Sequence, residues 1–157
     1  MAAAYARLAA LDGIDTLLLE GDLRHPSLAA LLGAGGGRNL LRVLEGRGGW
    51  RDAVGKDPAS PLHVLLADKA QEASYRLLDG HQLQNLLRDA AEDYKLIVLD
   101  APAIAAAPDA LLLARHADAI TLVVAAGATG EAAVRDAVDR LRLASSAQVA
   151  AVLNRAG

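Results

Sequence analysis

Cysteine and phenylalanine are both absent from this chain of 157 residues. Without cysteine, the sequence holds no disulfide, thiolate nucleophile or thiolate zinc site, and it fits a reducing compartment such as the cytoplasm. Aromatic residues make up only 3% of the chain, whereas apolar residues make up 54%. The core must therefore be built from leucine, valine, isoleucine and alanine, and a disordered chain is excluded.

The chain also lacks an excess of positive charge and a long apolar run. Its 16 basic and 19 acidic residues leave a formal net charge of −3, which offers nucleic acid or anionic lipid no electropositive face. No apolar run approaches the ~18 residues that a membrane span needs, and residues 1–11 have no export-signal pattern. The length matches one compact domain, since domains average roughly 150 residues.

Five short apolar runs without polar alternation predict strands that are buried on both faces. They are Thr16–Leu19, Leu62–Leu66, Leu96–Leu99, Ile120–Val124 and Val149–Leu153. Between them, leucine and alanine recur at helical spacing, as at Leu83, Leu86 and Ala90. This alternation of strand and helix predicts an α/β fold with a doubly wound, mostly parallel sheet.

The stretch Gly33–Pro61 is the least regular part of the sequence. Glycines interrupt it, including Gly35–Gly37, where we expect a turn, and Leu40–Leu44 is a short helix-like segment. We expect a mobile surface loop whose scattered apolar residues are too few to bury well.

Polar residues directly follow several of the predicted strands. Glu20 and Asp22 follow the first strand, Asp100 follows the third, and Asn154-Arg155 follows the last. Because ligands bind beyond the carboxyl ends of parallel strands, we expect these residues along one edge of the sheet. Carboxylates from two strands, together with the nearby Arg24, suit a magnesium–phosphate site. The alternative is that the acids merely cap turns and helices.

The sequence LLLEGDLRHPSL at Leu17–Leu28 resembles the Walker A-prime segment of bacterial tyrosine kinases of the capsule and exopolysaccharide type. LIVLDAP at Leu96–Pro102 resembles their Walker B motif, and the match continues through Pro108–Arg115 to Val152–Arg155. ATPases of the ParA and MinD type share parts of this pattern. The resemblance implies a P-loop NTPase-like fold and ATP-dependent protein-tyrosine (auto)kinase activity in exopolysaccharide or capsule biosynthesis.

The resemblance also implies roles for individual residues. Glu20, Asp22 and Asp100 are the expected catalytic residues, and Asp22 and Asp100 are the expected Mg²⁺ ligands. The expected ATP-binding residues are Arg24, Asn154 and Arg155. Glu20 stands where the family usually has an aspartate that assists the attacking tyrosine hydroxyl, and its side chain is one methylene longer.

One motif of the family is absent from the sequence. No Gly-x-x-x-x-Gly-Lys-Ser/Thr loop, which would bind phosphates through its backbone amides and lysine, occurs in the 157 residues. In the family this loop precedes the helix that we expect at Ala2–Leu11. We therefore expect a kinase-like domain, 1–157, that is truncated at both ends, lacks its first P-loop strand and is inactive by itself.

Three functional hypotheses stay open. The chain is most of a kinase domain, or a non-catalytic, degenerate paralogue that binds a partner in polysaccharide export, or a fragment of a ParA- or MinD-like ATPase. The resemblance implies a membrane activator of the chain-length-determinant type as the partner, with a homo-oligomer as a further option and no nucleic acid. It also implies a cytoplasmic location, peripheral at the inner membrane or fused to an inner-membrane protein.

Overall fold

The structure of the protein is a computed structural model that describes residues 1–34, 39–69 and 74–155. It forms two compact units, Met1–Pro102 and Ala103–Gly157. Strands alternate with helices in each unit, so the predicted α/β class is confirmed. The prediction of a single domain is not tested by this division. Among the described residues, no helix has the length and apolar character of a membrane span.

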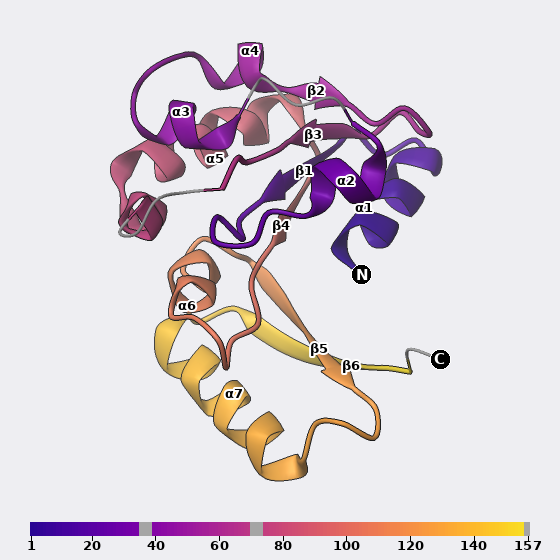
Figure 1. Ribbon diagram of the computed structural model, residues 1–157, viewed down its shortest axis with the longest axis vertical. Coiled ribbons are helices and arrows are strands. Elements are labelled where there is room, and N and C mark those ends of the chain that lie inside the picture. Colours follow the sequence, from indigo (N-terminus) through magenta and orange to yellow (C-terminus); the bar gives the residue numbers. More distant parts are fainter. Residues whose placement is uncertain (35–38, 70–73, 156–157) are drawn as a thin grey trace. The chain divides into compact units, whose positions relative to one another are not determined.

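A four-stranded sheet forms the centre of the first unit (Figure 1). Its strands are β1 (Thr16–Glu20), β2 (Gly55–Lys56), β3 (His63–Leu65) and β4 (Leu96–Asp100), in the order β2-β3-β1-β4. Strand β1 runs parallel to β3 and β4, and β2 is an antiparallel edge strand. The apolar runs predicted β1, β3 and β4, whereas β2 has no apolar residue to reveal it.

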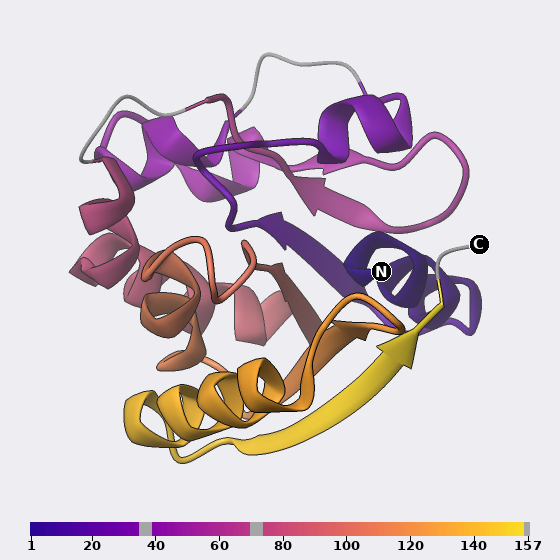
Figure 2. The ribbon, with the colours of Figure 1, turned by 60° about the horizontal axis from the view of Figure 1, so that its bottom comes forward.

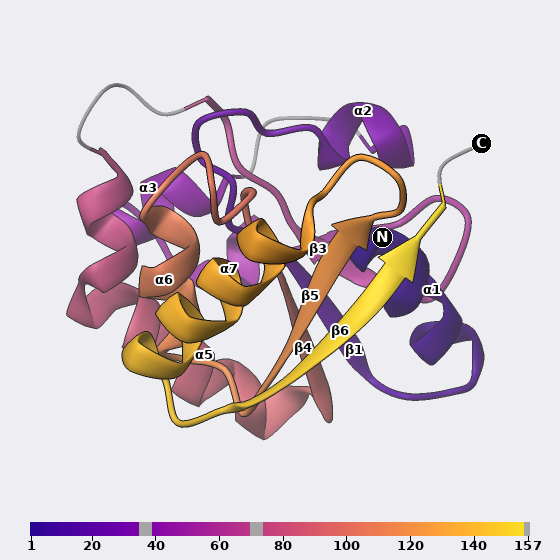
Figure 3. The same cartoon turned by 90° about the horizontal axis from the view of Figure 1, so that it is seen from below.

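Helices cover both faces of this sheet. On one face α1 (Ala2–Leu11) and α2 (Leu28–Leu32) pack their small and apolar side chains against Leu18 and Val64. Helix α5 (His81–Asp93) contacts β4 and lies on the opposite side from α1 (Figure 3). Successive residues of β1 point to opposite faces of the sheet, so Leu17 and Leu18 are both fully buried.

The stretch Gly33–Pro61 is a packed part of the first unit. It contains α3 (Leu40–Leu44), α4 (Trp50–Ala53) and β2. The prediction of a poorly buried loop is wrong, because Leu40 is fully buried and Trp50 is only 8% exposed. Gly46 adopts a left-handed φ of 73° just after α3, so the glycines there separate short packed helices. The expected turn at Gly35–Gly37 lies outside the described residues. A 3-10 helix, η1 (Ser74–Asp79), precedes α5.

A parallel strand pair forms the second unit. Strands β5 (Ala119–Ala125) and β6 (Gln148–Asn154) pair along their whole length, and α7 (Glu131–Ala144) connects them. Helix α6 (Asp109–Ala114) packs against α7, which runs alongside the strands in Figure 2. Both strands were expected from the apolar runs Ile120–Val124 and Val149–Leu153, and that prediction is confirmed. The mostly parallel strands thus belong to two hydrogen-bonded sheets.

Candidate active site at the ends of β1 and β4

Strands β1 and β4 end side by side with an acidic residue each. Glu20 is paired with Asp100 in the parallel ladder, and the amide of Gly21 donates to the carbonyl oxygen of Asp100 at 2.7 Å. Asp22 follows in the loop that leads from β1 to α2. The structure therefore brings three of the predicted site residues to one edge of the sheet, as parallel pairing requires.

The carboxylate of Glu20 is fully buried and bonded to the backbone on both sides. One oxygen accepts from the amides of Ser27 and Leu28, at 2.6 and 2.7 Å, and the other accepts from the amide of Ala67 at 2.9 Å. Ser27 is the N-cap of α2, so the negative charge also lies where the helix dipole favours it. Glu20 thereby ties together the ends of β1 and β3 and the start of α2.

Asp22 forms a turn in its own loop. Its Oδ1 accepts from the backbone amides of Arg24 and His25, at 3.1 and 2.9 Å. The Asp22 side chain is 21% exposed, so it is accessible at the sheet edge where Glu20 is not. Arg24 lies half-buried in the same loop. The short turn fixes the position of the Asp22 carboxylate and leaves it in contact with solvent.

Asp100 is half-buried, and its pKa is raised above the usual range. Burial is the main cause, and the negative charge of Glu20 adds to it, with a smaller contribution from Asp22. A cation bound beside these acids would relieve their repulsion. Within the described residues, no group of three or more histidine or acidic side chains could hold a metal ion. A Mg²⁺ ion there would need phosphate oxygens and water in addition to two carboxylates, its common arrangement in nucleotide sites.

The two remaining expected residues belong to the second unit. Asn154 ends β6 opposite Ala125, and its carbonyl oxygen accepts from the amide of Ala126 at 2.9 Å. Both Asn154 and Arg155 are exposed. Their convergence with the acids of the first unit on one ligand stays a prediction.

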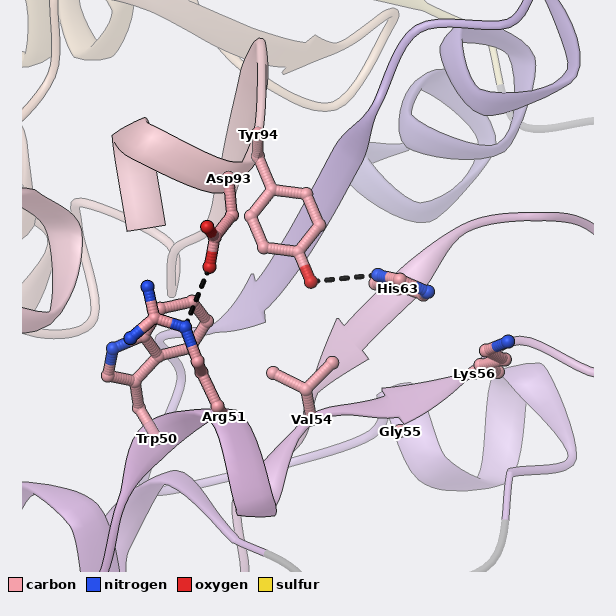
Figure 4. Close-up of a pocket in the computed structure, with 8 residues that line it drawn as sticks. All are labelled: Trp50, Arg51, Val54, Gly55, Lys56, His63, Asp93 and Tyr94. Carbon is pink, nitrogen blue, oxygen red and sulfur yellow. Dashed lines mark hydrogen bonds and ion pairs between the residues drawn. The ribbon is translucent and has the colours of Figure 1, made fainter. Parts of the chain in front are cut away.

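A second polar cluster, which the sequence did not reveal, lines a hollow of about 270 Å³ in the first unit (Figure 4). The Tyr94 hydroxyl lies 2.8 Å from Nδ1 of His63, and Nε of Arg51 donates to Asp93 at 2.8 Å. The Arg51 guanidinium also stacks over the ring of Trp50, 4.4 Å from its centre. Because these groups already bond to one another, the cluster holds α4, β3 and the end of α5 together.

Comparison with known proteins agrees with the motifs at β1 and β4. No protein-family model matches the chain. The sequence is 31% identical to the succinoglycan biosynthesis transport protein ExoP of Rhizobium meliloti (strain 1021), over 99% of this chain and 20% of that protein. It is 28% identical to the tyrosine-protein kinase YwqD of Bacillus subtilis (strain 168), over 98% of this chain and 65% of that protein.

The crystal structure of the VpsO kinase domain is similar as well. It superposes with a TM-score of 0.87 at 30% identity, over 96% of this chain and 75% of that one. This chain belongs to the bacterial tyrosine kinase family. It spans less than two thirds of the length of ExoP and YwqD. In fold alone, it also resembles the septum site-determining protein MinD complexed with Mg-ADP from Pyrococcus horikoshii OT3, with a TM-score of 0.78 at 21% identity, over 99% of this chain and 65% of that one.

Proposed function

We propose that this chain is the greater part of an ATP-dependent protein-tyrosine kinase domain that acts in exopolysaccharide biosynthesis. The observation that carries the proposal is the pairing of Glu20 with Asp100 at the carboxyl edge of the sheet, with Asp22 in the next loop. The similarity to YwqD supports a tyrosine kinase reaction, and the similarity to ExoP supports a role in exopolysaccharide biosynthesis.

In this proposal Asp22 and Asp100 hold Mg²⁺, which would neutralise the charge that develops on the phosphates of ATP. The raised pKa of Asp100 supports the assignment, because a half-buried acid beside two other acids gains from a bound cation. Arg24 would contact the phosphates, and Asn154 and Arg155 the adenine. For Glu20, the catalytic role stays a prediction, since its buried carboxylate holds three backbone amides.

The 157 residues alone are proposed to bind Mg-ATP weakly or not at all and to be inactive. They contain no Gly-x-x-x-x-Gly-Lys-Ser/Thr loop. If that loop supplies about three charge-assisted bonds of ~1.5–3 kcal/mol each, its absence removes ~4.5–9 kcal/mol. Micromolar binding amounts to only ~8 kcal/mol in total. Among the described strands of the first unit, β4 pairs with β1 alone, and in this proposal a strand that carries such a loop pairs with the other side of β4.

Calorimetry with Mg-ATP tests this proposal on two versions of the chain. The 157-residue chain should show no binding up to about 1 mM. A version extended upstream by a strand with Gly-Lys-Ser/Thr should bind in the micromolar range and phosphorylate tyrosine. In the extended version, the ATP affinity of Asp22→Asn and of Asp100→Asn should no longer depend on Mg²⁺. Micromolar binding by the 157 residues alone would overturn the argument from the loop.

A second function, a non-catalytic module that binds a partner in polysaccharide export, is favoured by one observation. Glu20, where the family usually has an aspartate, is fully occupied by backbone amides. If the extended chain still binds no ATP, this function replaces the kinase. In either case we propose a cytoplasmic location beside a membrane protein of polysaccharide export, as the name of ExoP suggests.

A further inference from the structure

A polar pair attaches helix α1 to the rest of the first unit. Arg7 is the only charged residue between Met1 and Leu11, and its Nε and Nη2 atoms donate to the two carboxylate oxygens of Asp57 at 2.8 and 2.7 Å. The residues that the helix buries are all alanines: Ala3, Ala6, Ala9 and Ala10. Because an alanine face has only shallow ridges, its packing opposes a shift of the helix along its axis weakly. The contact that can prevent such a shift is the Arg7–Asp57 pair.

Asp57 is a rigid partner for Arg7. Its side chain is fully buried, and the Ser60 hydroxyl donates to its carboxylate at 2.6 Å. The Asp57 amide donates to the carbonyl oxygen of Leu62 at 2.9 Å, next to the start of β3. A guanidinium that makes two parallel hydrogen bonds to a carboxylate fixes both the distance and the direction between the two groups. The pair therefore holds the middle of α1 at a defined position on the β2–β3 connection.

The N-terminal end of α1 lies at the acidic edge of the sheet. Helix α1 packs against β1 and β4, and only residues 12–15 separate its last residue, Leu11, from Thr16 at the start of β1. The helix consequently runs opposite to β1 (Figure 1), and it begins at the edge where β1 and β4 end. Burial raises the pKa of Asp100, and the positive charge of the Met1 amine opposes this rise, so the two groups lie near each other.

We infer that Arg7 and Asp57 are positioning residues for the phosphates of ATP. The inference rests on the proposed function, in which a phosphate-binding loop leads directly into α1. The position of α1 along the sheet then sets the distance between this loop and the Mg²⁺ ligands Asp22 and Asp100. Phosphates that bond to both sides tolerate little error in that distance. The pair acts from the opposite end of the sheet, because the β2–β3 connection leads into the amino end of β3, and neither residue touches the nucleotide.

A pair with a purely structural role would also matter for stability, so the test replaces both residues. Arg7→Met combined with Asp57→Leu leaves no buried charge without a partner, and such replacements commonly preserve stability. We expect this double variant to keep the Tm of the parent chain and yet to hold α1 less firmly. The matched control is Arg51→Met with Asp93→Leu, which removes a pair of the same unit outside α1. If the double variant does not fold, Arg7→Lys takes its place, because lysine keeps the charge but cannot form two parallel bonds.

Spin labelling tests the position of α1 in the 157-residue chain without nucleotide. A nitroxide on Ala4→Cys, at an exposed position of α1 in a chain without cysteine, should broaden the amide NMR signals of Gly21 and Asp100. Helices shift by about 1–2 Å when their packing changes, and because broadening falls with the sixth power of distance, it should change about twofold in the double variant. The control should show the broadening of the parent chain. Unchanged broadening in a folded double variant overturns the inference.

Calorimetry on the extended version tests the consequence for ATP. The double variant should bind Mg-ATP about tenfold more weakly, the effect of losing one charge-assisted hydrogen bond, and the control should bind like the extended parent. Equal affinities of the parent and a folded double variant also overturn the inference. An extended parent that binds no Mg-ATP overturns the proposed function instead, and the labelling result then shows by itself whether the pair fixes α1.

Discussion

Glu20 and Asp100 occupy the same level of the β1–β4 ladder, but their carboxylates are in opposite situations. The Glu20 carboxylate accepts hydrogen bonds from three backbone amides. Asp100 is half-buried, and its pKa is raised by burial and by the charge of Glu20. Folding therefore raises the pKa of Asp100 and makes its carboxylate form cost stability.

We expect Asp100 to titrate above the usual range for aspartate in a carboxyl NMR titration, and Glu20→Gln to lower its pKa. Because the pKa of Asp100 is raised by folding, its stabilising contribution is present at low pH and is lost as the pH rises through the folded-state value. Asp100→Asn should therefore stabilise the protein at pH 7, by about 0.5–1 kcal/mol, a typical size for a cross-strand pair. An unchanged or lower free energy of unfolding for Asp100→Asn contradicts this.

The second prediction separates Glu20 from Asp22. Glu20→Ala leaves three amides without their buried acceptor, and it should lower the free energy of unfolding by about 3 kcal/mol or more. Asp22→Ala removes a turn contact that is partly exposed, where water can replace the carboxylate, and should cost about 1 kcal/mol. Urea denaturation of both variants measures the difference. Equal, small losses would show that Glu20 does not hold the β1–α2 loop in place.

Much of the fold could be predicted from the sequence, because its signals are local. Doubly buried strands such as Leu96–Leu99 are uninterrupted apolar runs, and Gly13 and Gly33, both with left-handed φ, follow the ends of α1 and α2. The prediction for the segment that contains Leu40 and Trp50 is wrong, because its helices are too short to show which of their faces is buried. Leu40 is buried where α3 packs on α5, and Trp50 is buried beside Tyr94, both far along the chain.

The candidate site could be predicted in part for a similar reason. The rule that ligands bind at the carboxyl ends of parallel strands placed Glu20 and Asp100 together. It could not show what Glu20 bonds to, because the amide of Ala67 is 47 residues away and meets Glu20 only through the pairing of β1 with β3. The roles of Asn154 and Arg155 stay predictions.

The third prediction concerns Tyr94. Burial raises its pKa above the ordinary value, and the nearby charge of Asp93 adds to the effect. In an ultraviolet pH titration, Tyr94→Phe should remove a tyrosine that ionises above the ordinary range. Because folding raises this pKa, stability should fall as the pH rises from the ordinary tyrosine range through the folded-state value.

Tyr94→Phe also removes the hydrogen bond to His63 and should cost about 1 kcal/mol at pH 7. Tyr5→Phe is the matched control, because the Tyr5 side chain is 59% exposed and the variant should be as stable as the parent chain. If a tyrosine that ionises above the ordinary range persists in Tyr94→Phe, the raised pKa does not belong to Tyr94.

The last prediction compares two arginine–aspartate pairs of the first unit. Arg7 donates two hydrogen bonds to Asp57, whose side chain is fully buried, and this pair joins α1 to the β2–β3 connection. Arg51 bonds to Asp93, but both side chains are about half exposed, at 57% and 43%. Removing a buried partner leaves a charge uncompensated, whereas water replaces an exposed one. Asp57→Asn should therefore lower Tm by about 5–10 °C and Asp93→Asn by less than about 2 °C.

The hydrogen bonds from Arg7 lower the pKa of Asp57 below its usual range. A lowered pKa means that the pair stabilises the fold above the unfolded-state value and that this contribution disappears as the pH falls through the folded-state value. The difference in Tm between the parent chain and Asp57→Asn should thus be constant near neutral pH and shrink only in strong acid. Calorimetric scans over pH 2–7 measure it. A difference that is already gone at pH 5, or an equal loss for Asp93→Asn, would show that Asp57 is not the buried anchor of α1.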